Sequence, residues 1–156
     1  MNIKANFNKL ESLLTSVGNF LQCFVLLAVR LFWGWGFAQT GWGKLTHLDR
    51  TAGFFASIDI PLPKLNAILA GGTECLGGIL LMLGLASRLV TVPLMFVMVI
   101  AYLTADMEAV QAIFSDPDKF LAASPFLFLL ASVIVFAFGP GKLSLDALLK
   151  RPGISK

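Results

Sequence analysis

The sequence predicts an all-α membrane protein: a transmembrane four-helix bundle with a short N-terminal interfacial helix and both termini in the cytoplasm. Composition is the first indication, because apolar residues make up 57% of the 156 residues and charged residues 13%, whereas soluble domains average roughly 45–50% and about 25%. The second is four apolar segments, each close to the roughly 20 residues that cross a bilayer. The third is an uneven distribution of basic residues between the connecting segments. This composition excludes a nucleic-acid-binding domain, a disulfide scaffold, a disordered tail and an ordinary soluble enzyme.

Residues 1–19 form the N-terminal segment, which has a different pattern from the spans. Its apolar residues recur at helical spacing between residues 7 and 17, and polar residues fill the opposite face. This pattern is typical of a helix that lies in the membrane surface. The alternative interpretation is a frayed N-terminal tail.

The membrane domain is expected at residues 20–138, followed by a cytoplasmic C-terminal tail at 139–156. We expect its four spans at about 20–43, 65–85, 89–105 and 120–138.

Three connecting segments separate the spans. An outer loop at 44–64 leads into the second span through a Pro-rich stretch, and an inner turn at 84–88 contains Gly84 as the expected C-cap. A second outer loop at 106–119 has apolar residues at helical spacing, which predicts a short interfacial helix. Gly139, Pro140 and Gly141 should end the fourth span.

Basic residues indicate the orientation of the bundle. Seven Lys and Arg residues lie on the side that holds both termini, and four lie on the other side. Because basic residues favour the cytoplasm, both termini of this multi-pass protein should be cytoplasmic.

Two ionisable residues of opposite sign lie inside predicted spans. Arg30 is about ten residues into the first span, and Glu74 is about eleven residues before the end of the second. At about 1.5 Å per residue both would lie roughly 15–17 Å above the inner surface. Charged groups at such depth are costly and usually face the bundle interior. We therefore expect an Arg30–Glu74 ion pair near the bilayer midplane.

The surroundings of this pair suggest a pocket. Gly71 and Gly78 flank Glu74 at helical spacing, and small residues there allow close approach of another helix. The candidate pocket lining is Trp33, Phe37, Gly71, Gly78 and Tyr102. The pair could have a structural role, fixing how the first two spans dock, or form a proton-relay or ligand-binding centre.

Other candidate chemistry is sparse. His47 and Asp106 are weak metal candidates among acidic residues of the outer loops, and nothing in their spacing requires a metal site. No haem, flavin or nucleotide-binding motif is present, and the sequence has no complete catalytic set.

Four ordered motifs of the chain resemble the DoxX family of small bacterial membrane proteins. The first is Arg30 followed by a G-x-x-F-x-x-x-G-x-x-K-L stretch that ends at Leu45. The others are the segments Phe55–Pro63, Glu74–Arg88 (E-x-x-x-G-x-x-L-x-x-G-L-x-x-R) and Gly139–Asp146 (G-P-G-x-x-S-L-D). The resemblance covers about residues 24–148 and implies a four-helix bundle in the cytoplasmic membrane.

The resemblance also implies a range of functions. Some DoxX relatives are subunits of quinone-linked thiosulfate oxidation, and others accompany thiol-stress responses or the synthesis of modified metal-binding peptides. We therefore expect an accessory subunit or scaffold for a redox, thiol-stress or metal-handling system. The alternative is a quinone-binding subunit of a membrane oxidoreductase, with quinone as the possible cofactor, and a further alternative is a small-solute or proton-coupled carrier. The expected partners are the lipid bilayer and another protein or a second copy of this chain.

Overall fold

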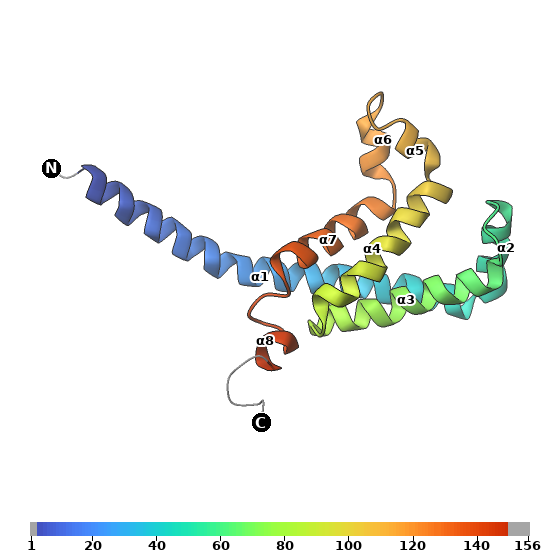
Figure 1. The fold of residues 1–156 in the computed structure, drawn as a ribbon, viewed down its shortest axis with the longest axis horizontal. Helices are drawn as coiled ribbons and strands as arrows, with labels where there is room; N and C mark the ends of the chain where they lie inside the picture. Colours follow the sequence, from blue (N-terminus) through green and yellow to red (C-terminus); the bar gives the residue numbers. More distant parts are fainter. Residues whose placement is uncertain (1–2, 150–156) are drawn as a thin grey trace.

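A computed structural model describes residues 3–149, which form eight α-helices and no strands (Figure 1). The helices are α1 Ile3–Thr46, α2 Leu48–Ser57, α3 Pro63–Leu83, α4 Ser87–Thr104, α5 Met107–Gln111, α6 Pro117–Ala122, α7 Pro125–Phe138 and α8 Leu145–Leu149. Helices α1, α3 and α4 are long and apolar enough to cross a membrane, and α7 is a shorter apolar helix of 14 residues. The all-α prediction is confirmed for the described residues.

Helix α1 is a single helix of 44 residues, about 66 Å long at 1.5 Å per residue. The segment in which we expected a separate interfacial helix is helical, and it continues into the first span without a break, since no proline interrupts it. Every side chain from Phe7 to Gln22 is exposed, and the first buried one described is Leu26. Figure 1 shows this N-terminal part of α1 extending away from the bundle. We call residues 7–22 the α1 arm.

Helices α1 and α3 pack closely through glycine. A Cβ added at Gly78 of α3 would lie 2.5 Å from the backbone nitrogen of Ala38, and one at Gly34 of α1 would lie 2.9 Å from the Gly78 oxygen. Small residues allow such backbone approach, which drives helix association in lipid where hydrophobic burial does not.

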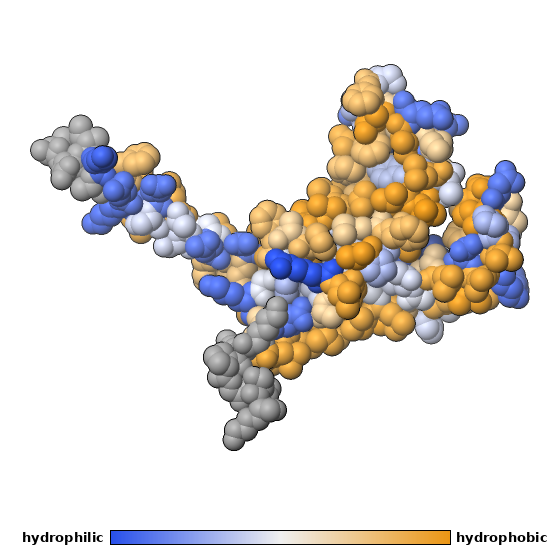
Figure 2. Space-filling model, in the orientation of Figure 1, coloured by the Kyte–Doolittle hydropathy of each residue, from blue (hydrophilic) through white to orange (hydrophobic). Residues whose placement is uncertain are grey.

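Helices α4 and α7 complete the bundle. The core comprises Phe37 of α1, Leu81 of α3, Val90, Leu94 and Met98 of α4, and Val135 of α7. Outside this core, large apolar side chains are exposed along α3, α4 and α7, and Figure 2 shows an extensive hydrophobic surface over the bundle. Such a surface is typical of helices that face lipid.

The helix ends agree with several predicted stop signals. Gly84 caps α3 in the left-handed conformation, with φ of 67°, as expected from its sequence position. Helix α7 ends at Phe138, and Gly139 follows with φ of 78°. The short helix expected in the second outer loop is present as α5.

Two further features differ from the prediction, one in the first outer loop and one at the start of the fourth apolar helix. The first outer loop contains the ten-residue helix α2. The fourth apolar helix begins at Pro125 rather than near Phe120, because Ala123 is extended, with φ of −62° and ψ of 137°. The chain therefore breaks at Ala123, two residues before Pro125, and Phe120 belongs to the separate helix α6.

Candidate functional site

Among the described residues, Arg30 of α1 is the larger of two fully buried charged side chains, with 1% of its surface exposed. Its Nη1 donates to the carbonyl oxygen of Pro140, and its Nη2 donates to that of Leu143 at 2.8 Å. Its Nε is buried and has no hydrogen-bond partner among the described residues. Arg30 therefore holds the segment that follows α7, and it does so through backbone carbonyls.

Glu74 of α3 is also 1% exposed, and it forms an ion pair with Lys44 near the C-terminal end of α1. The Lys44 side chain is 28% exposed. The Arg30–Glu74 ion pair predicted from the sequence is therefore wrong, because each residue has other partners.

The register of α1 against α3 explains the error. An added Cβ on Gly34 would contact Met82, and one on Gly41 would contact Cys75 and Gly71. Extending this antiparallel register puts Arg30 at the level of Gly84, where an added Cβ would lie 2.6 Å from Arg30 Nη1. Gly84 is ten residues beyond Glu74 in sequence, about 15 Å along a helix.

A sequence signal for the Lys44 partner did exist. Arg30, Phe37 and Lys44 are spaced by seven residues, which places them on nearly the same face of a helix. We assigned Lys44 to the outer loop because the apolar run seemed to end at Gly43. Helix α1 instead continues to Thr46, so Lys44 remains on the face that contacts α3.

The segment after α7 is anchored to the turn between α3 and α4. The Asp146 carboxylate accepts hydrogen bonds from the backbone nitrogens of Ala86 at 2.7 Å and Ser87 at 2.9 Å. The Asp146 backbone nitrogen donates to the Gly84 oxygen at 2.9 Å. Asp146 therefore caps the N-terminus of α4, where amide groups lack intrahelical acceptors and a negative charge is favoured. In the sequence, Asp146 is marked only as the last residue of the G-P-G-x-x-S-L-D motif, and nothing in that motif specifies its capping role.

The predicted pocket lining does not form one pocket. Trp33 and Phe37 pack against the ring of Phe128, with centroid distances of 5.0 Å and 4.7 Å. Gly71 and Gly78 lie at the α1–α3 contact. Tyr102 is buried, donates its hydroxyl to the Phe120 oxygen at 2.9 Å and stacks on the Phe120 ring. These side chains fill the interior or join helices, and none of them lines either cavity described below.

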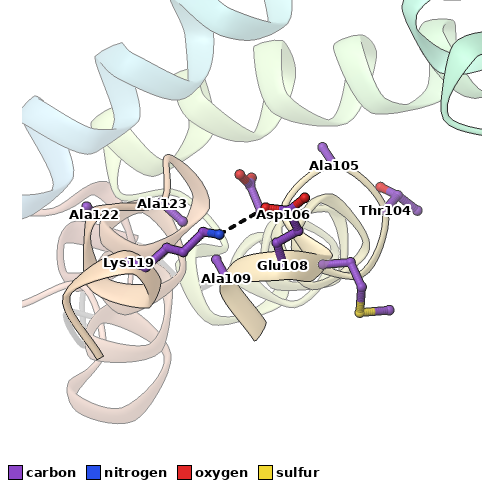
Figure 3. A pocket seen from close by; sticks show the side chains of 9 residues that line it. Thr104, Ala105, Asp106, Glu108, Ala109, Lys119, Ala122 and Ala123 are labelled. Atoms are coloured by element: carbon purple, nitrogen blue, oxygen red, sulfur yellow. Dashed lines mark hydrogen bonds and ion pairs between the residues drawn. The ribbon is translucent and has the colours of Figure 1, made fainter. Parts of the chain in front are cut away.

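One cavity of about 570 Å³ lies between the end of α4 and helices α5 and α6 (Figure 3). Lys119 of α6 pairs with Glu108 of α5 across it, at 2.9 Å. The hydrogen bond and positive charge of Lys119 lower the pKa of the Glu108 carboxyl. Asp106 also lines this cavity, so it is one of two carboxylates beside a single ammonium group.

A second cavity of about 430 Å³ lies at the opposite end of α4, beside the end of α7. Its lining residues are Ala86, Arg88, Leu89, Phe138, Gly139, Pro140 and Asp146. We call it the Arg88 cavity. It adjoins the segment that Arg30 and Asp146 hold in place, so the C-terminal segment forms part of its wall.

The weak metal candidates stay apart. His47 lies between α1 and α2, where its Nδ1 is 3.1 Å from the Thr46 hydroxyl and 3.2 Å from the Gly43 oxygen. Asp106 lies at the cavity between α4 and α6. Within residues 3–149, no three His, Cys, Asp or Glu residues group closely enough to hold a metal ion.

Comparison with known proteins adds family information. Residues 25–107 match the model of the DoxX family, and this stretch includes Arg30, Lys44 and Glu74. An uncharacterized membrane protein of Mycobacterium tuberculosis is 31% identical over 138 residues, covering 81% of this chain and 82% of that relative. No solved structure matches the chain.

Proposed function

We propose that this chain, which belongs to the DoxX family of membrane proteins, is an accessory subunit or scaffold for a membrane redox, thiol-stress or metal-handling system. The chain is a multi-pass membrane protein and contacts the lipid bilayer. The accessory role is our inference from the exposed α1 arm and from the range of systems that the family serves.

The orientation that fits this role has both termini in the cytoplasm of a bacterial inner membrane. The Arg88 end of the bundle also carries Lys142, and the α1 arm carries Lys9. The opposite end carries Asp49, Asp106 and Glu108. An excess of basic residues on the cytoplasmic side supports this placement.

The observation that carries the proposal is the α1 arm. It has an apolar stripe, in which Leu10, Leu13 and Leu14 are 56–64% exposed, and it contains Lys9 and Glu11 on its polar side. The arm has no neighbour among residues 23–149 that buries this stripe, and a helix that exposes an apolar stripe gains by burying it elsewhere. A partner helix of another membrane protein would bury it, as an accessory subunit requires.

Co-purification tests this role directly. A tagged full-length chain is isolated from its native membranes in mild detergent, and retained proteins are quantified by mass spectrometry. Leu10→Glu puts a charge on the apolar stripe, and Asn8→Glu puts the same charge on the polar face as a matched control. We expect one membrane protein to be enriched with the wild type and with Asn8→Glu, and to fall at least about tenfold with Leu10→Glu. Equal retention by all three would contradict the proposal.

A second candidate function, quinone binding, is favoured by the Lys44–Glu74 ion pair. Buried ion pairs stabilise poorly on balance, and ionisable residues in spans usually serve function. The partly exposed Lys44 ammonium can donate a hydrogen bond to a quinone carbonyl, and the Glu74 carboxylate holds that ammonium in place. Because Phe37 is buried in the core and Trp33 packs against the Phe128 ring, this candidate is centred on Lys44 and Glu74.

Quinone-analogue binding separates the two candidates. Saturable binding to the purified chain, weakened in Glu74→Gln and unchanged in Glu108→Gln, would support a quinone site. No binding at an analogue concentration near its solubility limit would remove it and leave the accessory role standing.

A further inference from the structure

The Arg88 cavity has features that the accessory role does not use. It lies between the first turn of α4 and the end of α7, and its far wall is the segment that Arg30 holds. Its volume of about 430 Å³ is enough for a phosphate group and the atoms bonded to it. In the orientation proposed above, it is at the cytoplasmic membrane surface.

One basic and one acidic side chain line this cavity, Arg88 and Asp146. Arg88 is exposed, and its guanidinium makes one hydrogen bond within the described residues, a long one of 3.3 Å to the Ala137 oxygen. A guanidinium has five N–H donors, so most of them are available to a ligand. Asp146 is the single acidic side chain of the lining, and its carboxylate is already engaged by the amides of Ala86 and Ser87. The lining therefore has one cation and one anion, and Arg88 is the group whose free N–H donors can bind an anionic ligand.

The backbone of α4 offers further N–H donors. The amides of Arg88 and Leu89 belong to the first turn of an 18-residue helix, so they have no intrahelical acceptor. Asp146 already binds the two preceding amides, those of Ala86 and Ser87, so the amides of Arg88 and Leu89 are the ones left for a second acceptor.

The rim of the cavity is apolar and faces outward. Leu89 is 74% exposed and Phe138 is 64% exposed, although both line the cavity. A free inorganic anion would gain nothing from these two side chains. The acyl chains of a lipid would cover them, because a headgroup at Arg88 would place its chains along the surfaces of α4 and α7.

We propose that the Arg88 cavity binds the phosphate group of an anionic membrane phospholipid, with its acyl chains against Leu89 and Phe138. Basic pockets between membrane helices on the cytoplasmic side bind such headgroups in general. The inference does not depend on the accessory role, which concerns the α1 arm at a separate surface.

Lipid binding to the full-length chain tests the proposal. The purified protein in detergent is titrated with short-chain phosphatidylglycerol, with phosphatidylcholine and with inorganic phosphate, and bound lipid is measured by native mass spectrometry. Arg88→Gln removes the guanidinium, and Arg50→Gln is the matched control, because Arg50 is an exposed arginine in α2 at the other end of the bundle. Arg88→Lys keeps the charge, and size-exclusion profiles and helical circular dichroism establish that each variant is folded.

We expect phosphatidylglycerol to bind at least about tenfold more tightly than phosphatidylcholine. Its affinity should fall about tenfold in Arg88→Gln, fall less in Arg88→Lys and stay unchanged in Arg50→Gln. Equal binding of both lipids, or full binding by Arg88→Gln, would overturn the proposal. Displacement of the lipid by millimolar inorganic phosphate would also overturn it, because the site would then be one for a free anion.

Discussion

Gly41 offers the sharpest test of the α1–α3 packing, through the substitution Gly41→Ala. The added Cβ would overlap the backbone nitrogen of Cys75 and would lie 2.6 Å from the Gly71 oxygen and 2.8 Å from the Cys75 Cα. All three atoms belong to the backbone of α3, so no side-chain rotation can relieve the contact. Ordinary contact begins near 3.4 Å, so relieving the Gly71 contact alone requires a shift of 3.4 − 2.6 = 0.8 Å.

The size of the effect follows from two opposing contributions. Overpacking of a close contact costs about 1–3 kcal/mol, whereas replacing a helical glycine by alanine gains up to about 1 kcal/mol of helix propensity. Because the contact is with the backbone of α3, the upper part of the overpacking range, about 2–3 kcal/mol, applies. Subtracting a propensity gain of about 1 kcal/mol leaves an expected loss of about 1–2 kcal/mol in the free energy of unfolding of Gly41→Ala. Gly43→Ala and Gly72→Ala should be neutral or stabilising, because an added Cβ at either position has nothing within 4 Å.

Reversible unfolding in mixed micelles is the assay, with far-ultraviolet circular dichroism measured against the mole fraction of dodecyl sulfate. A double variant of Gly41→Ala and Gly78→Ala should lose less than the sum of the single losses, because one separation of α1 from α3 relieves both contacts and coupled sites are not additive. If Gly41→Ala and Gly43→Ala unfold at the same mole fraction of dodecyl sulfate, the close α1–α3 contact deduced above is incorrect.

Three further predictions concern the charged groups. Arg30→Met removes two charge-assisted hydrogen bonds and should speed hydrogen exchange over residues 140–146, measured by mass spectrometry, while exchange in the remote helix α2 stays unchanged. Glu74→Gln leaves Lys44 without its carboxylate and should lower the free energy of unfolding by about 1–3 kcal/mol. This is less than the roughly 3–5 kcal/mol of a fully buried pair, because Lys44 is partly exposed. In the same unfolding assay, Lys44→Met combined with Glu74→Gln should recover part of the loss, and no recovery would mean that the two side chains are not coupled. Lys119 lowers the pKa of Glu108 below its ordinary 4.5, so their pairing stabilises above that pH and is lost as pH falls through the lowered pKa. The melting temperature of the wild type should therefore approach that of Lys119→Met as the pH is lowered below the ordinary pKa. A difference between the two that stays constant throughout the acid titration would contradict this.

Local signals predicted the ends of helices well. Gly84 and Gly139 end α3 and α7 because left-handed backbone is accessible to glycine at low cost. Apolar length predicted α1, α3 and α4, which are long enough to span a membrane, whereas α7, the fourth predicted span, is an apolar helix of 14 residues. These features depend on residues near one another in the chain, so the sequence alone contains the required information.

The partners of Arg30 and Glu74 depend on register, which no local signal specifies. We measured depth from the first apolar residue, and this assumed that the first span begins at Phe20. Helix α1 begins much earlier, and its packing against α3 is set by where glycines allow the backbones to meet. The predicted depth of Arg30 relative to Glu74 is therefore wrong by about 15 Å. This distance is large enough that each of the two charged side chains has a different partner from the predicted one.

The glycine contacts and the two buried charges together select one register for α1 against α3. In lipid, apolar side chains gain little by leaving the acyl chains, so a smooth apolar seam would tolerate sliding. A slip by one helical turn moves α1 by about 5.4 Å, which would separate Arg30 from the Pro140 and Leu143 carbonyls and Lys44 from Glu74. The same slip would place side chains where Gly41 now meets the backbone of α3. Each charge would then be buried without a partner, at a cost of several kcal/mol. The charged side chains thus contribute more to the choice of one register than to net stability. A single register of α1 against α3 also holds the α1 arm in one direction relative to the bundle.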